Sequence, residues 1–491
     1  MAPFFRAMPG IRVRSCASAI IDAIYPAKPC TQAARMPLSD PLARLQLPLA
    51  AATLAAALVL GGGQGTPGDG AVQLMSLALL VACLFRHARD PDARLPRVAW
   101  LAAVPLLLPM VQLLPLPEGL WLMPGARREL AAELAAAGVD PATRWSLVPL
   151  ATERALLWLL PAVALFLSAL QLHSGQRTVL LQLVVVGAVA GAVLGLAQLA
   201  AGPESALRFY AQTNPTEAVG FFANRNHLAS LLAVSLPLVV VGTAAWYSRC
   251  DELDARALFG LAAGAGLVAL LILGIAITRS RAGLLLGMLA LLGSLPIVLA
   301  LRRRRGTRRA LAVAVSLGLM LVVQFALFGI LQKMEKDPLD DARFQYLPVV
   351  EAAARTHAPL GSGLGGFRRA FEAEHDSPGT AYVNHAHNDW AEVWLEGGWL
   401  GRVLLFAAAG GLLVSGWRAW RSGRAGSAAQ RAIARAAWLG MLLLALHSLG
   451  DYPLRKTSIL AVAGVLAACV VAPGRTALAH PSTRTLDSHA A

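Results

Sequence analysis

Charged side chains are scarce in this chain. Only 14% of its 491 residues are Asp, Glu, Lys or Arg, whereas 57% are hydrophobic. A soluble domain usually carries about 25% charged residues. This shortage excludes a set of soluble domains and indicates one large domain whose apolar surface is covered by lipid as well as by packing.

Cysteine is also rare, and the five cysteines form no CxxC pair. We therefore expect neither a disulfide framework nor a metal cluster. The formal net charge of +15 raises the question of a nucleic-acid partner. Most Lys and Arg residues, however, lie in short links between apolar blocks, where membrane topology explains them. We expect no nucleic acid to bind.

The apolar blocks are long enough to cross a bilayer, which takes about 20 helical residues. They predict an all-α polytopic membrane helical bundle with about twelve transmembrane helices. The predicted spans are residues 46–62, 72–85, 98–116, 154–172, 178–201, 226–246, 257–277, 283–301, 310–330, 398–416, 432–449 and 457–473.

Alternate links differ in charge, which predicts the orientation. One set, which includes RHARDPDAR, RRRRGTRR and RAWRSGRAGSAAQR, is rich in Arg, whereas GGGQGTPGDGA in the other set has no Lys or Arg. Positive links stay in the cytoplasm. Residues 46–473 then form a membrane domain between cytoplasmic tails at 1–45 and 474–491. The first 35 residues make a poor signal peptide, so we expect a disordered tail or a true start at Met36.

The opposite, periplasmic set holds the long loops. The loop at 117–153 contains ARRELAAELAAAG, which has the spacing of an amphipathic helix at a membrane surface. The largest loop spans about residues 332–396 and is expected to be helical. Its segment DDARFQYLPVVEAAARTH predicts a helix, and HAPLGSGLGGF predicts a Gly-rich turn.

Four polar clusters fall on this same side. They are FFANRNHLAS, TRSRAG, NHAHND and HSLGDYPLRK, at residues 221–230, 278–283, 384–389 and 447–456. A charge at the end of a span costs little, whereas a deeper one costs roughly 2.5–3.5 kcal/mol on insertion scales and tends to be functional. We expect a helical bundle to bring these clusters together.

Arg225 and Arg281 lie on the side where the positive-inside rule opposes arginine. Paired guanidinium groups suit a diphosphate, because each planar fork offers parallel donors to phosphate oxygens. For Arg279 a topological role is the simpler interpretation. Arg279 and Arg281 would face opposite sides of a helix. We choose Arg281, because Gly283 beside it permits close approach.

The histidine cluster admits two kinds of chemistry. His385 and His387 could form a metal pair in an extended segment, but no third ligand has a convincing spacing. A general base is the sharper hypothesis, because neutral imidazole accepts a hydroxyl proton near pH 7. The only DxD pair, Asp90-Pro91-Asp92, lies in a predicted cytoplasmic link and is interpreted as a turn. We therefore expect no metal or other cofactor.

At these residues the sequence resembles the O-antigen ligase family, whose superfamily includes O-antigen polymerases and some protein O-oligosaccharyltransferases. The family signature begins with His, which is followed by Asn, Ser or Gln. Nine residues of any type come next, then Gly, then two residues of any type, and finally Gly, Thr or Tyr. Here His387 and Asn388 are followed by DWAEVWLEG, Gly398, Trp399-Leu400 and Gly401. FFANRNHLAS, TRSRAGLLLG, PLGSGLGGF and HSLGDYPLR also look like family segments, in the family's order. The resemblance covers about residues 150–470.

The resemblance implies a metal-independent inverting glycosyltransferase of the bacterial inner membrane. It would take a glycan from undecaprenyl diphosphate on the periplasmic face and pass it to lipid A–core or another glycan acceptor. His387 would activate the acceptor hydroxyl, and Arg225 and Arg281 would hold the diphosphate. Supporting roles would fall to Asn224, Asn226, Arg279, Asn388, Gly398, Gly401, Asp451 and Arg455.

Several alternatives stay open. Asp451 and Arg455 could instead form an ion pair that sets the last two spans. A polymerase would extend a chain on the lipid carrier, and a protein O-glycosyltransferase would modify Ser or Thr. A transporter without catalysis would also use charged cavities, but it predicts inverted repeats and broken helices at mid-membrane, which the sequence lacks. A structural scaffold gives no reason for polar clusters on one side.

Overall fold

The computed structural model describes residues 41–301 apart from 64, 211–213, 251 and 253, together with residues 342–374, 383–421 and 426–472. Across this part of the chain every regular element is a helix, and no β-strand occurs. The prediction of an all-α fold is confirmed. Most of each predicted tail lies outside the described residues, and so does the predicted span 310–330.

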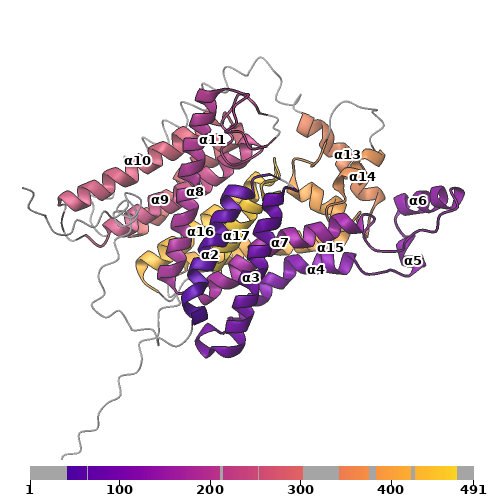
Figure 1. Ribbon diagram of the computed structural model, residues 1–491, viewed down its shortest axis with the longest axis horizontal. Coiled ribbons are helices and arrows are strands. Elements are labelled where there is room, and N and C mark those ends of the chain that lie inside the picture. Colours follow the sequence, from indigo (N-terminus) through magenta and orange to yellow (C-terminus); the bar gives the residue numbers. More distant parts are fainter. Residues whose placement is uncertain are drawn as a thin grey trace, which may run out of the picture. The chain divides into compact units, whose positions relative to one another are not determined.

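Nine helices among the described residues are long and apolar enough to cross a membrane, so the prediction of a polytopic membrane protein is confirmed. They are α2 (Pro41–Leu60), α3 (Pro67–Arg89), α7 (Pro149–Gln171), α8 (Ser174–Ala201), α9 (Arg225–Tyr247), α10 (Ala255–Ile277), α11 (Arg281–Leu301), α15 (Asp389–Trp420) and α16 (Ala428–His447), all labelled in Figure 1.

Two further predicted spans are shorter than expected. The span predicted at 98–116 is a 3₁₀ segment, Arg97–Ala102, followed by α4, Ala103–Gln112. Pro105 lies in the first turn of α4, where proline is tolerated, and Pro109 lies inside the helix. The last predicted span is α17, Thr457–Val471. Both are apolar but fall below the length of the nine long helices.

The described helices fall into two compact units. The first unit, Val184–Pro338, contains most of α8 and all of α9, α10 and α11. Helix α9 is buried along its whole apolar stretch and packs against α10 and α11. Small residues permit this close packing: a Cβ added at Gly283 of α11 would lie 2.5 Å from the Cβ of Ala229 in α9.

The second unit, Leu42–Leu183 and Leu339–Ala491, contains the remaining helices. Helix α7 packs against α3, α4 and α17, while α16 lies between α15 and α17. The predicted surface helix in the first long loop is present as α6, Gly125–Ala136, after the short helix α5, Glu118–Trp121.

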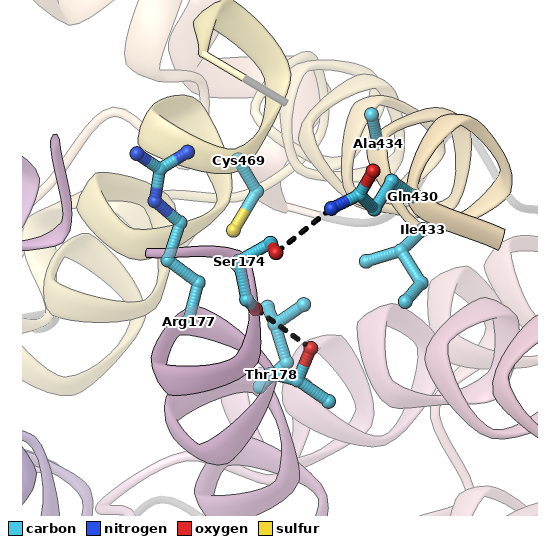
Figure 2. Close-up of a pocket in the computed structure, with 8 residues that line it drawn as sticks. Ser174, Arg177, Thr178, Gln430, Ile433, Ala434 and Cys469 are labelled. Carbon is cyan, nitrogen blue, oxygen red and sulfur yellow. Dashed lines mark hydrogen bonds between the residues drawn. The ribbon is translucent and has the colours of Figure 1, made fainter. Parts of the chain in front are cut away.

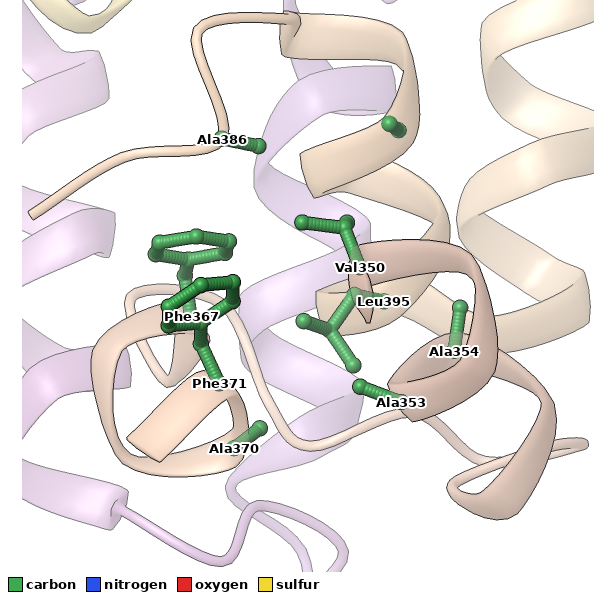
Figure 3. Packing of buried hydrophobic residues seen from close by; sticks show 9 residues of the cluster. Val350, Ala353, Ala354, Phe367, Ala370, Phe371, Ala386 and Leu395 are labelled. Carbon is green, nitrogen blue, oxygen red and sulfur yellow. The ribbon is translucent and has the colours of Figure 1, made fainter. Parts of the chain in front are cut away.

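The largest loop contributes α13, Ala342–Thr356, and α14, Phe367–Glu374, which pack against α15 (Figure 1). The helix predicted from DDARFQYLPVVEAAARTH and the Gly-rich turn after it are confirmed, since Gly361, Gly363 and Gly365 all have positive φ. Figure 3 shows the apolar core of this region, in which Phe367 and Phe371 of α14 gather with Val350 of α13 and Leu395 of α15. This core anchors the N-terminal part of α15.

Candidate functional site

His387 lies immediately before α15 in a left-handed backbone conformation, with φ of 50°. The next residue, Asn388, is the N-cap of α15, and its side-chain oxygen accepts hydrogen bonds from the backbone N–H groups of Trp390 and Ala391 at 3.0 and 3.1 Å. Such a cap satisfies N–H groups that have no partner within the helix. The His-Asn pair of the signature therefore places the imidazole at the helix start.

Asp451 faces that imidazole. The Nδ1 atom of His387 is 3.5 Å from Oδ1 of Asp451, whose side chain is fully buried. The backbone N–H of Tyr452 donates to the same carboxylate at 2.9 Å, and the Tyr452 ring meets the His387 ring edge-on at 5.0 Å. Nδ1 of His387 is buried, yet 23% of the side chain is exposed. One side of the ring thus faces a fixed carboxylate while another side is accessible.

Arg455 is the centre of a second, buried cluster of charges. Its guanidinium is 2.8 Å from Glu396 and 3.6 Å from both Asp389 and Glu392. These carboxylates share one face of α15, because residues three, four and seven apart align on a helix. Burial lowers the pKa of Arg455, but the three carboxylates outweigh it and raise that pKa above its ordinary value.

The interpretation of Asp451 and Arg455 as an ion pair with each other is therefore wrong: Arg455 pairs with α15, and Asp451 faces His387. Ser448 reinforces the junction between α15 and α16, since its hydroxyl donates to Asp389 at 2.8 Å and its carbonyl accepts from the Asp389 N–H at 2.9 Å. The NHAHND and HSLGDYPLRK clusters thus converge, as predicted.

His385 is buried beside Glu392. Its Nδ1 lies 2.8 Å from Glu392, and its ring stacks on Tyr452 at 4.2 Å. Burial lowers the pKa of His385, against the opposing effect of Glu392. His385 was considered only as half of a metal pair, and Glu392 and Glu396 were not predicted from the sequence. The spacing of Asp389, Glu392 and Glu396 was the signal that could have revealed them, because carboxylates on one face of an apolar helix require a buried cation.

The two signature glycines mark a break in α15. Gly398 has φ of 55° and ψ of −146°, which interrupts the helix. A Cβ there would collide with the carbonyl oxygen of Pro359 and lie 2.6 Å from the carbonyl carbon of Leu360. A Cβ at Gly401 would lie 2.8 Å from the carbonyl oxygen of Val393. Gly398 therefore lets the Gly-rich turn lie against the broken helix, while the absence of a side chain at Gly401 leaves room for the backbone of Val393.

We expect Gly398→Ala to destabilise the protein. Its backbone conformation is essentially restricted to glycine and costs roughly 1–3 kcal/mol for other residues, before the collision with Pro359 is added. Gly410→Ala is the matched control on the same helix, because a Cβ at Gly410 meets nothing within 4 Å. Thermal unfolding of both variants in detergent measures the difference. Equal midpoints for the two variants would contradict the constraint at Gly398.

The first unit holds the arginines predicted to bind diphosphate. Arg225 is the first residue of α9, and its guanidinium pairs with Glu217 at 2.5 Å. Asn224 is the N-cap of α9, and its side-chain oxygen accepts from the backbone N–H of Asn226 at 2.8 Å. Asn226 itself is buried, and its carbonyl accepts from the hydroxyl of Ser230. Asn224 therefore caps the helix that begins at Arg225.

Arg279 and Arg281 are both exposed. Arg279 lies in the turn between α10 and α11 with φ of 50°, and Arg281 is the first residue of α11. The segment TRSRAG thus lies where the predicted spans 257–277 and 283–301 meet, and the two arginines do not share one helix. Gly283 serves the close packing of α11 against Ala229 of α9. Arg225 and Arg281 thus begin neighbouring helices whose first turns lie side by side.

A small cavity of about 30 Å³ lies elsewhere in the second unit, lined in part by Ser174, Arg177 and Gln430 (Figure 2). Gln430 donates to the hydroxyl of Ser174 at 2.8 Å. Arg177 is committed to backbone carbonyl groups, including those of Ala169 and Ala472. The volume suits one or two water molecules. We interpret this cavity as a packing gap, because it contains none of the predicted site residues.

A comparison with known families supports the motif-based prediction. Residues 266–406 match the family model described as O-antigen ligase. No curated protein matches the chain. The matched segment contains TRSRAG, the Gly-rich turn and the complete signature, while FFANRNHLAS and HSLGDYPLR lie outside it. The predicted resemblance to the O-antigen ligase family is confirmed over residues 266–406, and these residues belong to a polytopic membrane protein.

Proposed function

We propose that this protein is a ligase that transfers a glycan from undecaprenyl diphosphate to a hydroxyl group of lipid A–core on the periplasmic face of the inner membrane. The observation that carries the proposal is the pairing of partly exposed His387 with buried Asp451 at 3.5 Å. A carboxylate beside Nδ1 favours the tautomer with its proton on that atom, as in other base–carboxylate pairs. The lone pair of Nε2 is then free to accept a proton.

The reaction requires one proton acceptor and a stabilised leaving group. Nε2 of His387 takes the proton of the acceptor hydroxyl as its oxygen attacks the anomeric carbon of the donor. The bond from that carbon to the diphosphate oxygen breaks, and undecaprenyl diphosphate leaves with the electron pair. A single displacement of this kind inverts the anomeric configuration. It needs no metal, so a chelator is expected to leave the rate unchanged.

Arg225 and Arg281 are assigned to the diphosphate, whose negative charge grows as the bond breaks. The neighbouring first turns of α9 and α11 support a shared role for them. Arg281 is exposed and offers its planar donors directly. Arg225 has to exchange Glu217 for a phosphate oxygen or use the donors that the carboxylate leaves free.

Arg281→Gln is expected to raise the KM for the lipid-diphosphate donor by about 10- to 100-fold, because a hydrogen bond to a charged group contributes about 1.5–3 kcal/mol. Arg279→Gln is the matched control, since Arg279 is an exposed arginine in the adjoining turn. Initial rates at varied donor concentration, with the acceptor saturating, measure both constants. A larger effect in Arg279→Gln would reverse our choice between the two residues.

The acceptor decides between the proposed ligase and its alternatives. The wild-type protein in lipid nanodiscs is given undecaprenyl-diphosphate oligosaccharide with and without lipid A–core, in the presence of chelator. Glycan on lipid A–core supports the ligase. Longer chains on the lipid carrier without lipid A–core would make the protein a polymerase, and glycan on added Ser/Thr peptide would make it a protein glycosyltransferase. Movement of donor across the bilayer without any transfer would favour a transporter.

A further inference from the structure

Arg402 lies in α15, one turn beyond the break at Gly398, and aromatic rings surround its guanidinium. The carbon at the centre of the guanidinium is 4.6 Å from the ring centre of Trp394, 5.8 Å from that of Trp399 and 6.0 Å from that of Phe406. Attraction between a guanidinium and an aromatic face acts within about 6 Å. The rings therefore hold the cation in a defined place.

The guanidinium of Arg402 makes no ion pair and no hydrogen bond with the rest of the described chain. This distinguishes it from Arg455, which has three carboxylates, and from Arg225, which has Glu217. Contacts with ring faces leave the five N–H donors of a guanidinium unused. Arg402 is thus a positioned cation whose donors are available to an anion.

The surface beside Arg402 is apolar and exposed. Trp399 is 55% exposed, Val403 62% and Phe406 58%. On a helix long enough to span a membrane, such a surface contacts lipid chains. The long apolar stretch of α15 begins at the break, so Arg402 lies near the level where a spanning helix meets the lipid headgroups. A ligand here would combine an acidic headgroup with an acyl chain.

We propose that Arg402 and its three aromatic neighbours bind the phosphate headgroup of an anionic membrane lipid at the end of α15 that carries His387. The planar guanidinium of Arg402 donates two parallel hydrogen bonds to phosphate oxygens, and the aromatic rings fix its orientation. The acyl chain lies along Trp399, Val403 and Phe406. The proposal concerns lipid binding and not the chemical step of glycan transfer, so it can be tested separately.

The test compares Arg402→Gln with Arg421→Gln. Arg421 is the control because it is an exposed arginine at the other end of α15, with its guanidinium 4.4 Å from the ring centre of Trp417. The full chain is released from phosphatidylcholine nanodiscs doped with phosphatidylglycerol, and the bound lipids are counted by native mass spectrometry. We expect Arg402→Gln to retain phosphatidylglycerol about tenfold more weakly than the wild type, whereas Arg421→Gln retains it normally. Arg402→Lys should be intermediate, because it keeps the charge and loses the fork.

A second arm replaces phosphatidylglycerol with lipid A, either intact or stripped of its phosphates. If Arg402→Gln weakens the binding of intact lipid A but not that of the other lipids, the site still binds phosphate, and its ligand is the glycolipid. Equal weakening in Arg402→Gln and Arg421→Gln overturns the proposal, because Arg402 is then an ordinary arginine of the membrane interface. Unchanged retention in Arg402→Gln also overturns it.

Discussion

Replacing His387 with alanine is expected to slow glycan transfer by about 10²- to 10⁴-fold, the usual contribution of a positioned general base. The loss should fall on kcat rather than on the KM for the donor, because the imidazole acts on the acceptor hydroxyl as the new bond forms. Single-turnover transfer in nanodiscs, with donor and acceptor saturating, measures this rate.

Asp451→Asn extends the same test to the partner of His387. An amide at this position can present its NH₂ group to Nδ1, which favours the tautomer with its proton on Nε2 and removes the lone pair needed for base catalysis. We therefore expect a large loss of kcat with the protein still folded. His173→Ala is the control, since His173 lies between α7 and α8. Transfer at the wild-type rate by His387→Ala would remove the proposed base.

Arg455→Gln is expected to cause the largest loss of stability, about 3–5 kcal/mol, because it leaves buried carboxylates without their cation. Three carboxylates depend on this one guanidinium, and Glu396 and Glu392 are almost entirely buried. Thermal unfolding in detergent measures the change. Arg418→Gln is the control on the exposed surface of α15 and should change stability by no more than about 0.5 kcal/mol.

A double variant shows whether the loss comes from the unpaired charge. Adding Glu396→Gln to Arg455→Gln removes one of the stranded carboxylates, so the two changes should cost less together than the sum of their separate costs. Residues in one charge network usually show coupling of about 0.5–3 kcal/mol. Strict additivity would mean that Arg455 acts by packing, for example against the ring of Trp158.

The lengths of the apolar runs in the sequence predicted most of the membrane-spanning helices. The spans at 226–246 and 257–277 agree with α9 and α10 to within two residues at each end. The same criterion is less accurate at α4, Ala103–Gln112, which is shorter than the predicted span 98–116. The length of apolar runs also does not predict that the helix after His387 begins at Asp389 and breaks at Gly398. That break depends on the close approach of the turn at Pro359.

The sequence predicted several residues of the candidate site but not how their side chains pair. The signature identified His387 and Asn388, and the polar clusters identified Asp451 and Arg455. Their pairing was not predictable, because it depends on how α15 and the segment after α16 meet. The aromatic surroundings of Arg402 were invisible for a different reason: in sequence the residue is one arginine in an apolar run, and the rings gather around it only on the folded helix.

The central claim is that one base, His387, activates an acceptor hydroxyl for a single displacement on a lipid diphosphate. The most direct measurement is the anomeric configuration of the transferred sugar, determined by NMR on donor of known configuration and on the glycan released from lipid A–core. Inversion is the predicted result. Retention of configuration would contradict the claim, because it requires two displacements and a covalent or otherwise shielded intermediate.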